Sequence, residues 1–265
     1  MDVRPIGIFD SGLGGLTGVR ALERLLPGED LIYFGDSANA PYGTRSVEEL
    51  RRLALANAAF LNRFDVKAVL VACGTVSSNA MEPLRERFDF PFFSVLEPPC
   101  REAAAVTETG RVAVAATDAT IRSGAFDRCL RTLDPEGRLQ VFSKSCQSLV
   151  RTVEAGHFRP GDPVAERAVA EELAAIRDFG PDTVILACTH FPLLEDVIRA
   201  YLGPKVGLIS VGASAAAALA EDLAARDALN TKEQGTRRFF TSGDPEEFSR
   251  LAEMFLGHQI TVNHV

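Results

Sequence analysis

The sequence lacks the features by which several protein classes are recognised. Its five cysteines stand far apart and none forms a Cys-X-X-Cys pair, so zinc-ribbon and thioredoxin-like motifs have no support. Residues 1–8 do not form a basic segment followed by an apolar run, and no apolar stretch is long enough to span a bilayer. We therefore expect a cytoplasmic protein with reduced thiols, no signal peptide and no membrane partner.

An excess of basic residues is also missing. The 265-residue chain has 36 acidic and 28 basic residues and a formal net charge of −8. A nucleic-acid-binding protein usually has a basic face, so we expect no nucleic-acid partner. The charge does not exclude an anionic substrate, because a pocket of amides and hydroxyls can bind carboxylates within an acidic protein. Hydrophobic residues make up 46% of the chain, which is ordinary for a folded protein of one or two domains.

Short apolar runs alternate with longer helical patterns. Runs such as 68–72 and 183–187 show no polar alternation, which is typical of strands buried on both faces of a parallel sheet. Segment 47–64 has apolar residues at intervals of three and four, which predicts a helix. The alternation predicts the α/β class. Further strands are expected at 5–9, 30–34, 91–95, 111–115, 139–142, 207–211 and 238–241, and further helices at 16–26 and 165–178.

Two distant segments resemble each other. Phe64-Asp-Val-Lys-Ala-Val-Leu-Val-Ala-Cys73 aligns with Phe179-Gly-Pro-Asp-Thr-Val-Ile-Leu-Ala-Cys188, so each cysteine directly follows a buried strand. The repeat predicts two similar parallel-sheet α/β domains that face each other across a central cleft, with one thiol from each. We place the crossings between the domains at 96–99 and 210–217. The expected domains are therefore 1–96 together with 209–265, and 97–208.

Cys73 and Cys188 suit the inversion of a carbon atom. In α/β folds ligands bind at the carboxyl ends of strands, where both cysteines are expected. Inversion removes a proton from one face and adds one to the other, and two opposed bases do this without moving across the plane. A thiol, with a reference pKa near 8.5, is readily tuned toward neutrality. A single cysteine is more often a core residue, but the matched pair favours acid/base chemistry.

Polar residues near the two cysteines are candidates for assisting them. Asp10 and Ser11 follow the first strand and can take or hold the Cys73 proton, although either can instead cap the next helix. His190 lies two residues after Cys188 and can shift its pKa, or can be a structural histidine. The turn 41–46 can hold a carboxylate on open backbone N–H groups, or can simply be an N-cap at Ser46.

The same residues allow two other chemistries. The glycines of 12–17 suggest a dinucleotide-binding turn, but Thr17 stands where that pattern needs a third small residue. A zinc site made of Cys73, Cys188, His190 and Asp10 is conceivable by ligand type, but it lacks paired ligands at a close, fixed spacing.

Five segments of the chain together are highly specific. They are Ile8-Phe-Asp-Ser-Gly-Leu-Gly-Gly-Leu16, Tyr33-Phe-Gly-Asp-Ser37, Pro41-Tyr-Gly-Thr-Arg-Ser46, Ala187-Cys-Thr-His-Phe-Pro-Leu-Leu194 and Phe240-Thr-Ser-Gly-Asp-Pro245. On these segments the sequence resembles glutamate racemases, within the wider aspartate/glutamate racemase family. The resemblance covers nearly the whole chain. It implies a cofactor-independent enzyme that interconverts L- and D-glutamate, supplies D-glutamate for bacterial peptidoglycan and often forms a homodimer.

The resemblance also implies roles for individual residues. Cys73 and Cys188 are expected to be the two bases, with Asp10 and His190 as assisting groups and Glu154 as the carboxylate behind the second thiol. No metal is implied. The residues expected to bind substrate are Asp10, Ser11, Pro41, Tyr42, Gly43, Gly74, Thr75, Thr117, Thr120, Thr189 and His190.

Three positions depart from the family pattern. The family has Cys-Asn-Thr where this chain has Cys73-Gly-Thr75, Cys-Pro-Leu-Phe where it has Cys146-Gln-Ser-Leu149, and Val-Asp where it has Val211-Gly212. Loss of the amide at position 74 predicts binding weaker by about 1–3 kcal/mol if a partner group is left unpaired. The alternatives are a pocket reshaped for another substrate, such as aspartate or an arylmalonate-like or hydantoin-like compound, and a ligand-binding paralogue without turnover.

Overall fold

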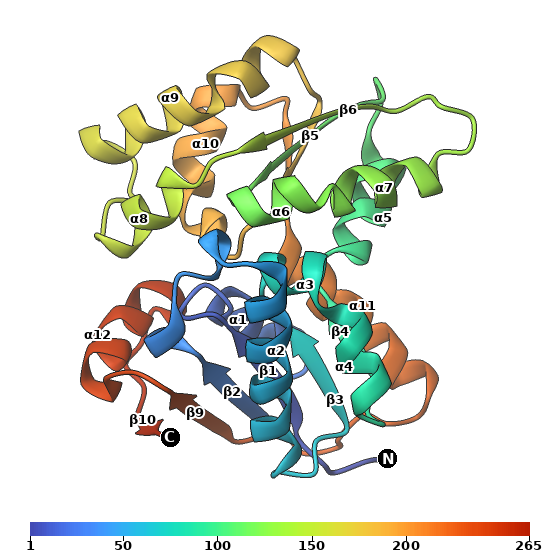
Figure 1. Ribbon diagram of the computed structural model, residues 1–265, viewed down its shortest axis with the longest axis vertical. Coiled ribbons are helices and arrows are strands. Elements are labelled where there is room, and N and C mark those ends of the chain that lie inside the picture. The colour runs from blue at the N-terminus through green and yellow to red at the C-terminus, as the bar shows by residue number, and fades with distance from the viewer.

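The computed structural model describes residues 1–265 and confirms the predicted α/β class (Figure 1). Two sheets are present, and every pair of neighbouring strands is parallel. Sheet A has the order β10-β9-β2-β1-β3-β4, and sheet B has the order β6-β5-β7-β8. Sheet A comprises β1 (Ile6–Asp10), β2 (Leu31–Gly35), β3 (Ala68–Val71), β4 (Phe92–Ser94), β9 (Arg237–Thr241) and β10 (Val262–His264). Sheet B comprises β5 (Arg111–Ala116), β6 (Gln140–Ser145), β7 (Thr183–Leu186) and β8 (Gly207–Ser210).

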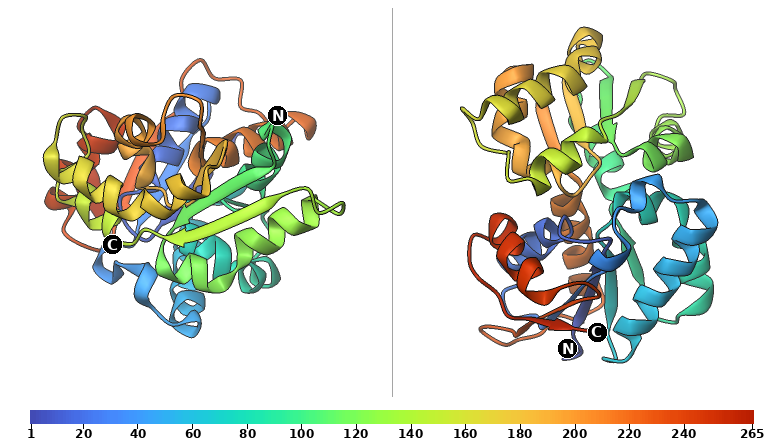
Figure 2. Two further views of the ribbon diagram at one scale, coloured as in Figure 1. Left: turned by 90° about the horizontal axis from the view of Figure 1, so that it is seen from above. Right: turned by 60° about the vertical axis from the view of Figure 1, so that its left-hand side comes forward.

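We call sheet A with its covering helices the first half, and sheet B with its covering helices the second half. They form two lobes, and both chain ends lie in the first (Figure 2). The first half contains α1 (Leu16–Leu25), α2 (Val47–Asn62), α3 (Gly74–Asn79), α4 (Met81–Arg87), α11 (Val211–Ala225) and α12 (Pro245–Leu256). The second half contains α5 (Glu97–Val106), α6 (Asp118–Ser123), α7 (Ala125–Leu133), α8 (Ser148–Glu154), α9 (Pro163–Phe179) and α10 (Glu195–Leu202). None of these helices combines the length and the apolar character that a membrane crossing needs.

Alternation along the strands divides the core between the two faces of sheet A. Ile8 belongs to a cluster of 49 buried residues that includes α1 and α11 and continues into the second half. Its neighbour Phe9 points the other way, into a separate cluster of 18 buried residues under α2. Successive strand residues face opposite sides of a sheet, so both faces must be covered. This double burial explains why the strands appear in the sequence as unbroken apolar runs.

The two halves repeat one arrangement of strands. The order β2-β1-β3-β4 corresponds to β6-β5-β7-β8, and the register agrees, because Ile6 pairs with Ala68 as Val112 pairs with Thr183. β3 and β7 are therefore equivalent strands. The predicted repeat is borne out in space, since Cys73 and Cys188 follow these two strands at the same point.

The chain passes between the halves at junctions where a strand is followed by a helix. It leaves β4 and enters α5 at Leu96, and it returns from β8 into α11 at Val211. The proline pair expected to form a crossing lies in the first turn of α5, a position that tolerates proline because those N–H groups have no partner within the helix. Most of 210–217, expected as a connecting segment, is likewise the start of α11.

Two strands differ from the expectation. β6 continues to Ser145, three residues beyond the predicted end, and β10 at the opposite edge of the molecule was not predicted. Both are edge strands with polar or half-exposed residues, so the apolar run that marks a buried strand is weak or absent.

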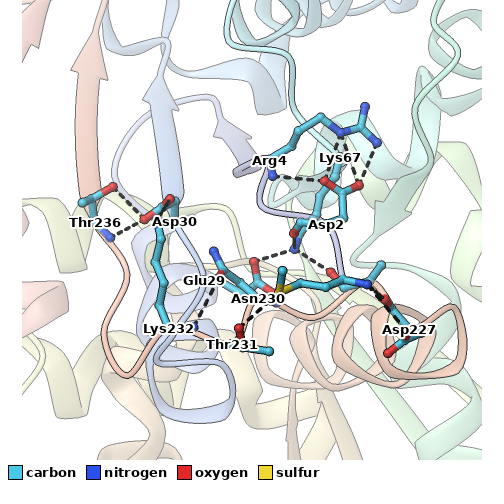
Figure 3. A network of polar contacts seen from close by, with 12 residues as sticks. Asp2, Arg4, Glu29, Asp30, Lys67, Asp227, Asn230, Thr231, Lys232 and Thr236 are labelled. Carbon is cyan, nitrogen blue, oxygen red and sulfur yellow. Dashed lines mark hydrogen bonds and ion pairs between the residues drawn. The ribbon is translucent and has the colours of Figure 1, made fainter.

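A polar network joins distant chain segments at the amino end of β3 (Figure 3). Lys67 Nζ lies 2.7 Å from Glu29 Oε2, and the two side chains are only 1% and 2% exposed. The ammonium also donates to the carbonyls of Asp2 and Ala228, at 2.8 and 2.7 Å. Glu29 Oε1 accepts from the backbone of Asn230 at 2.7 Å. One buried cation thus ties the start of the chain to the segment that follows α11.

The equivalent position in the second half is Asp182, at the amino end of β7. Its carboxylate accepts from Thr107 Oγ1 at 2.7 Å, from the backbone N–H groups of Glu108 and Thr109 at 2.8 and 2.6 Å, and from Thr109 Oγ1 at 2.9 Å. Burial opposes ionisation, but these hydrogen bonds outweigh it and lower the pKa of Asp182 to about 2. Here an anion fixes the turn that leads into β5.

Candidate active site

The carboxyl ends of equivalent strands meet at one cavity of about 40 Å³ between the halves. Both cysteines line it, Cys73 from the first half and Cys188 from the second, and the two residues are only 4% and 6% exposed. The other predicted residues that line it are Asp10, Ser11, Pro41, Tyr42, Gly43, Gly74, Thr75, Thr117, Glu154, Thr189 and His190. Thr120 does not line the cavity; it is buried and shares a hydrogen bond of 3.0 Å with the Thr117 hydroxyl.

The Cys73 thiol lies in an acidic environment. Its Sγ donates to Ser11 Oγ at 3.7 Å, and the Ser11 hydroxyl is 3.4 Å from Asp10 Oδ1. Asp10 Oδ2 accepts from the backbone of Gly15 at 2.7 Å. Burial, followed by the negative charge of Asp10, raises the pKa of Cys73, and burial also raises the pKa of Asp10. The first thiol is therefore held in its protonated form, with a hydroxyl and a carboxylate behind it.

The Cys188 thiol lies beside a basic group instead. Its Sγ lies 3.8 Å from His190 Nδ1, and His190 Nε2 lies 3.1 Å from Glu154 Oε1. Burial alone would lower the pKa of His190, but its contacts with Cys188 and Glu154 outweigh burial and raise the pKa to about 10. The imidazole is therefore charged at neutral pH. Glu154, with its side chain 42% exposed, lies at the rim of the cavity and orients the ring.

Hydroxyl groups connect the two halves beside the thiols. Thr75 Oγ1 and Thr117 Oγ1 are 3.1 Å apart, so one residue from each half contributes to the same wall. The hydroxyl of Tyr42 is used within the first half, because it donates to Asp36 and accepts from Asn57. Tyr42 therefore fixes the loop 41–43 at the rim and offers no free donor from its ring.

The glycine-rich turn after β1 has a packing role that accounts for its composition. A Cβ atom on Gly14 would lie 2.3 Å from Thr189 Oγ1 and 2.5 Å from His190 Nδ1. Thr17 Oγ1 donates to the carbonyls of Gly14 and Thr189, at 2.8 and 3.2 Å. Glycine lets this turn approach the loop that carries the second thiol. The contact explains the pattern without a dinucleotide.

Five lining residues were not predicted as site residues. Gly12, Ala40, Val150 and Ala187 contribute mainly backbone or apolar surface, whereas Gln147 contributes an amide side chain. In the sequence Gln147 appears only as a departure from the family pattern, and no spacing links it to the cysteines. For the zinc alternative, no group of three or more His, Cys, Asp or Glu side chains is arranged to hold a metal ion.

The fold and the cavity define a class of protein with two parallel-sheet α/β halves and one thiol from each at a shared site. A family model described as Asp/Glu/Hydantoin racemase matches residues 15–220, and the chain belongs to this family. It is 41% identical over 261 residues to a glutamate racemase of Geobacter metallireducens, an alignment that covers 98% of this chain and 95% of that one.

Solved structures agree along the full length. A glutamate racemase isoform from Bacillus anthracis superimposes with a TM-score of 0.93 at 35% identity, covering 100% of this chain and 98% of that one. A glutamate racemase from Francisella tularensis, solved in complex with D-glutamate, gives a TM-score of 0.91 at 34% identity with the same coverage. The predicted family resemblance is confirmed.

Proposed function

We propose that this chain is an isomerase that interconverts L- and D-glutamate by moving a proton between two thiols. The observation that carries the proposal is that Cys73 and Cys188 reach one cavity from equivalent strands of opposed halves. Glutamate is supported as the substrate because the relatives named above are glutamate racemases over nearly their whole length. The aspartate alternative is not favoured by these relatives.

In this proposal the two thiols start the reaction in different protonation states. The Cys188 thiolate, beside the charged His190, removes the α-proton from one face, and the electron pair of the C–H bond delocalises into the adjacent carboxylate. The protonated Cys73 then donates its proton to the opposite face. One turnover leaves Cys188 as a thiol and Cys73 as a thiolate, with the Ser11 hydroxyl beside it. The reverse reaction uses the same groups in exchanged roles.

Several further expectations belong to this proposal. We propose that the enzyme needs no cofactor, supplies D-glutamate for peptidoglycan, and works as a homodimer in the cytoplasm, where both thiols stay reduced. We also propose that residues 1–96 with 209–265, and residues 97–208, behave as two domains. The passages of the chain at Leu96 and Val211 support these boundaries.

Solvent-isotope exchange tests the function. In D₂O the purified protein should introduce deuterium at the α-carbon of both glutamate enantiomers and abolish their circular dichroism. Cys73→Ala and Cys188→Ala should each lower the racemisation rate about 1000-fold or more, since a positioned acid or base contributes roughly 10²–10⁴. Cys129→Ala, at a half-buried thiol outside the cavity, is the matched control. Racemisation that survives removal of either cavity thiol would refute the two-thiol reaction.

A further inference from the structure

The cavity offers few side-chain donors for an anionic substrate. No Lys or Arg lines it, and two of its side chains, Asp10 and Glu154, are acidic. The Thr75 and Thr117 hydroxyls share one hydrogen bond, and Tyr42 is engaged elsewhere. The Thr189 hydroxyl also lines the cavity and makes no hydrogen bond within the chain. An amino-acid substrate with two carboxylates needs more donors than this, because an unpaired charge is costly in a buried site.

Position 74 has no side chain that could supply a further donor. A Cβ atom there would lie 2.5 Å from the carbonyl oxygen of Ala187, which belongs to the backbone of the opposite half. Backbone cannot rotate away as the end of a flexible side chain can. Any side chain at this position would force the halves apart, so Gly74 serves their close approach.

Gln147 is the one amide side chain that lines the cavity. Its Oε1 accepts from the backbone N–H of Asp118 at 3.1 Å, which fixes which end of the amide is oxygen. The Nε2 group, with two hydrogens to donate, makes no hydrogen bond within the chain. The amide lies against Gly43 of the first half, where a Cβ atom would come within 2.7 Å of Oε1 and 3.3 Å of Nε2. Gln147 thus reaches across the cleft with its donor end unused.

We propose that Gln147 is a substrate-binding residue whose Nε2 donates to a carboxylate of the amino acid, beside Gly43 and Thr117. This inference rests on the proposed function and names one of the groups that recognise the acidic substrate. The hydrogen bond from Asp118 holds the amide in position before the substrate arrives. Little side-chain entropy is then lost on binding.

Two substitutions separate substrate binding from a structural role. Gln147→Glu keeps an oxygen that accepts from Asp118 but replaces the donor with a negative charge. Gln147→Met removes both. If Nε2 binds a carboxylate, KM for glutamate should rise about 10- to 100-fold in Gln147→Met and further in Gln147→Glu. If the residue only supports Asp118, Gln147→Glu should match the wild type, and that result would overturn the proposal. Gln259→Met, at an exposed site, is the control.

A second substrate distinguishes the two carboxylates. The probe is 2-aminobutyrate, which lacks the side-chain carboxylate, and its α-proton exchange in D₂O is followed by NMR. If Nε2 donates to the side-chain carboxylate, Gln147→Met should weaken the binding of glutamate but not that of 2-aminobutyrate. A donor to the α-carboxylate predicts that both substrates are weakened.

Calorimetry of glutamate binding separates this inference from the proposed function. If the wild type binds glutamate without racemising it and Gln147→Glu weakens that binding at least tenfold, the function fails and the inference holds. If the wild type racemises glutamate and neither substitution changes KM or affinity, the inference fails and the function holds.

Discussion

β3 and β7 are equivalent strands that carry opposite charges at both ends. β3 begins beside the buried cation Lys67 and leads to a thiol next to the carboxylate of Asp10. β7 begins beside the anion Asp182 and leads to a thiol next to the charged His190. The strands share register and burial, so the difference lies in the charged residues around their ends.

The fold and the local charges have separate effects on the two thiols. The repeated fold places two sulfurs at one cavity, and on its own it would make them alike. A carboxylate lies beside one sulfur and an imidazolium beside the other, so the two thiols differ in their electrostatic surroundings. The amino ends of the strands show that structural anchoring, too, is achieved with either sign of charge.

The largest effect is expected from breaking the buried ion pair between Lys67 and Glu29 in the first half. Lys67→Met leaves Glu29 buried without its partner, and this should cost about 3–5 kcal/mol of unfolding free energy in urea titrations. The value of kcat/KM for the folded fraction should not change, because the cavity lies at the other end of β3. The double variant Lys67→Met with Glu29→Gln should recover part of the loss. No recovery would mean that the ion pair is not the source.

Removal of the assisting charges should affect rate more than stability. Asp10→Asn and His190→Gln are each expected to lower kcat by about 10²–10³, measured by circular dichroism. Only Asp10→Asn should keep the imidazole titration near pH 10 in NMR spectra. Asp89→Asn, at an exposed site, is the control. Rates within tenfold of the wild type would show that the two thiols do not depend on these neighbours.

The stability that the Asp182 carboxylate contributes to the second half should decrease in acid. The pKa of Asp182 is lowered to about 2, so the ionised carboxylate stabilises the native state above pH 4 and loses this effect as the pH falls through 2. Asp182→Asn should cost about 1–2 kcal/mol at pH 6. The gap to the wild type should close between pH 4 and 2 in urea titrations. A gap that is independent of pH would contradict the ionic origin.

The smallest effect is expected at the rim. Glu154→Gln removes one of the contacts that raise the pKa of His190, so the NMR titration should move below pH 10 and kcat should fall about three- to tenfold. The raised pKa of His190 stabilises the wild type fully below pH 6.5, and this stabilisation is lost as the pH rises through 10. In the variant the loss should again begin near pH 6.5 but should be complete at a lower pH than in the wild type, as measured in thermal melts. An unchanged titration would exclude Glu154 as a partner.

The sequence predicted most of the fold because parallel strands buried on both faces are unbroken apolar runs. The strands that include Ile8, Val69 and Ile185 have this pattern, and each lies where it was expected. β10 escaped because Val262–His264 is short, polar and exposed at an edge. The connections at 96–99 and 210–217 were expected as linking segments because prolines and small residues occur there, yet both sequences begin helices.

The candidate site was predictable as far as its residues follow strands. Asp10, Cys73, Thr117 and Cys188 each come directly after or within a few residues of a strand end, where the fold rule places ligands. Glu154 and Gln147 lie at the two ends of α8, which reaches the cavity only through packing of the second half. No local spacing reports such a contact, and Glu154 was selected by resemblance alone.

Sheet A draws strands from both ends of the chain, whereas sheet B comes from one uninterrupted stretch. On a ribosome every strand of sheet B is synthesised before β9 and β10 exist. The second half can therefore fold on the ribosome while the first half still lacks β9 and has β2 as an open edge. Truncation at either terminus damages the first half. The position of Cys73 is therefore more vulnerable to truncation than that of Cys188.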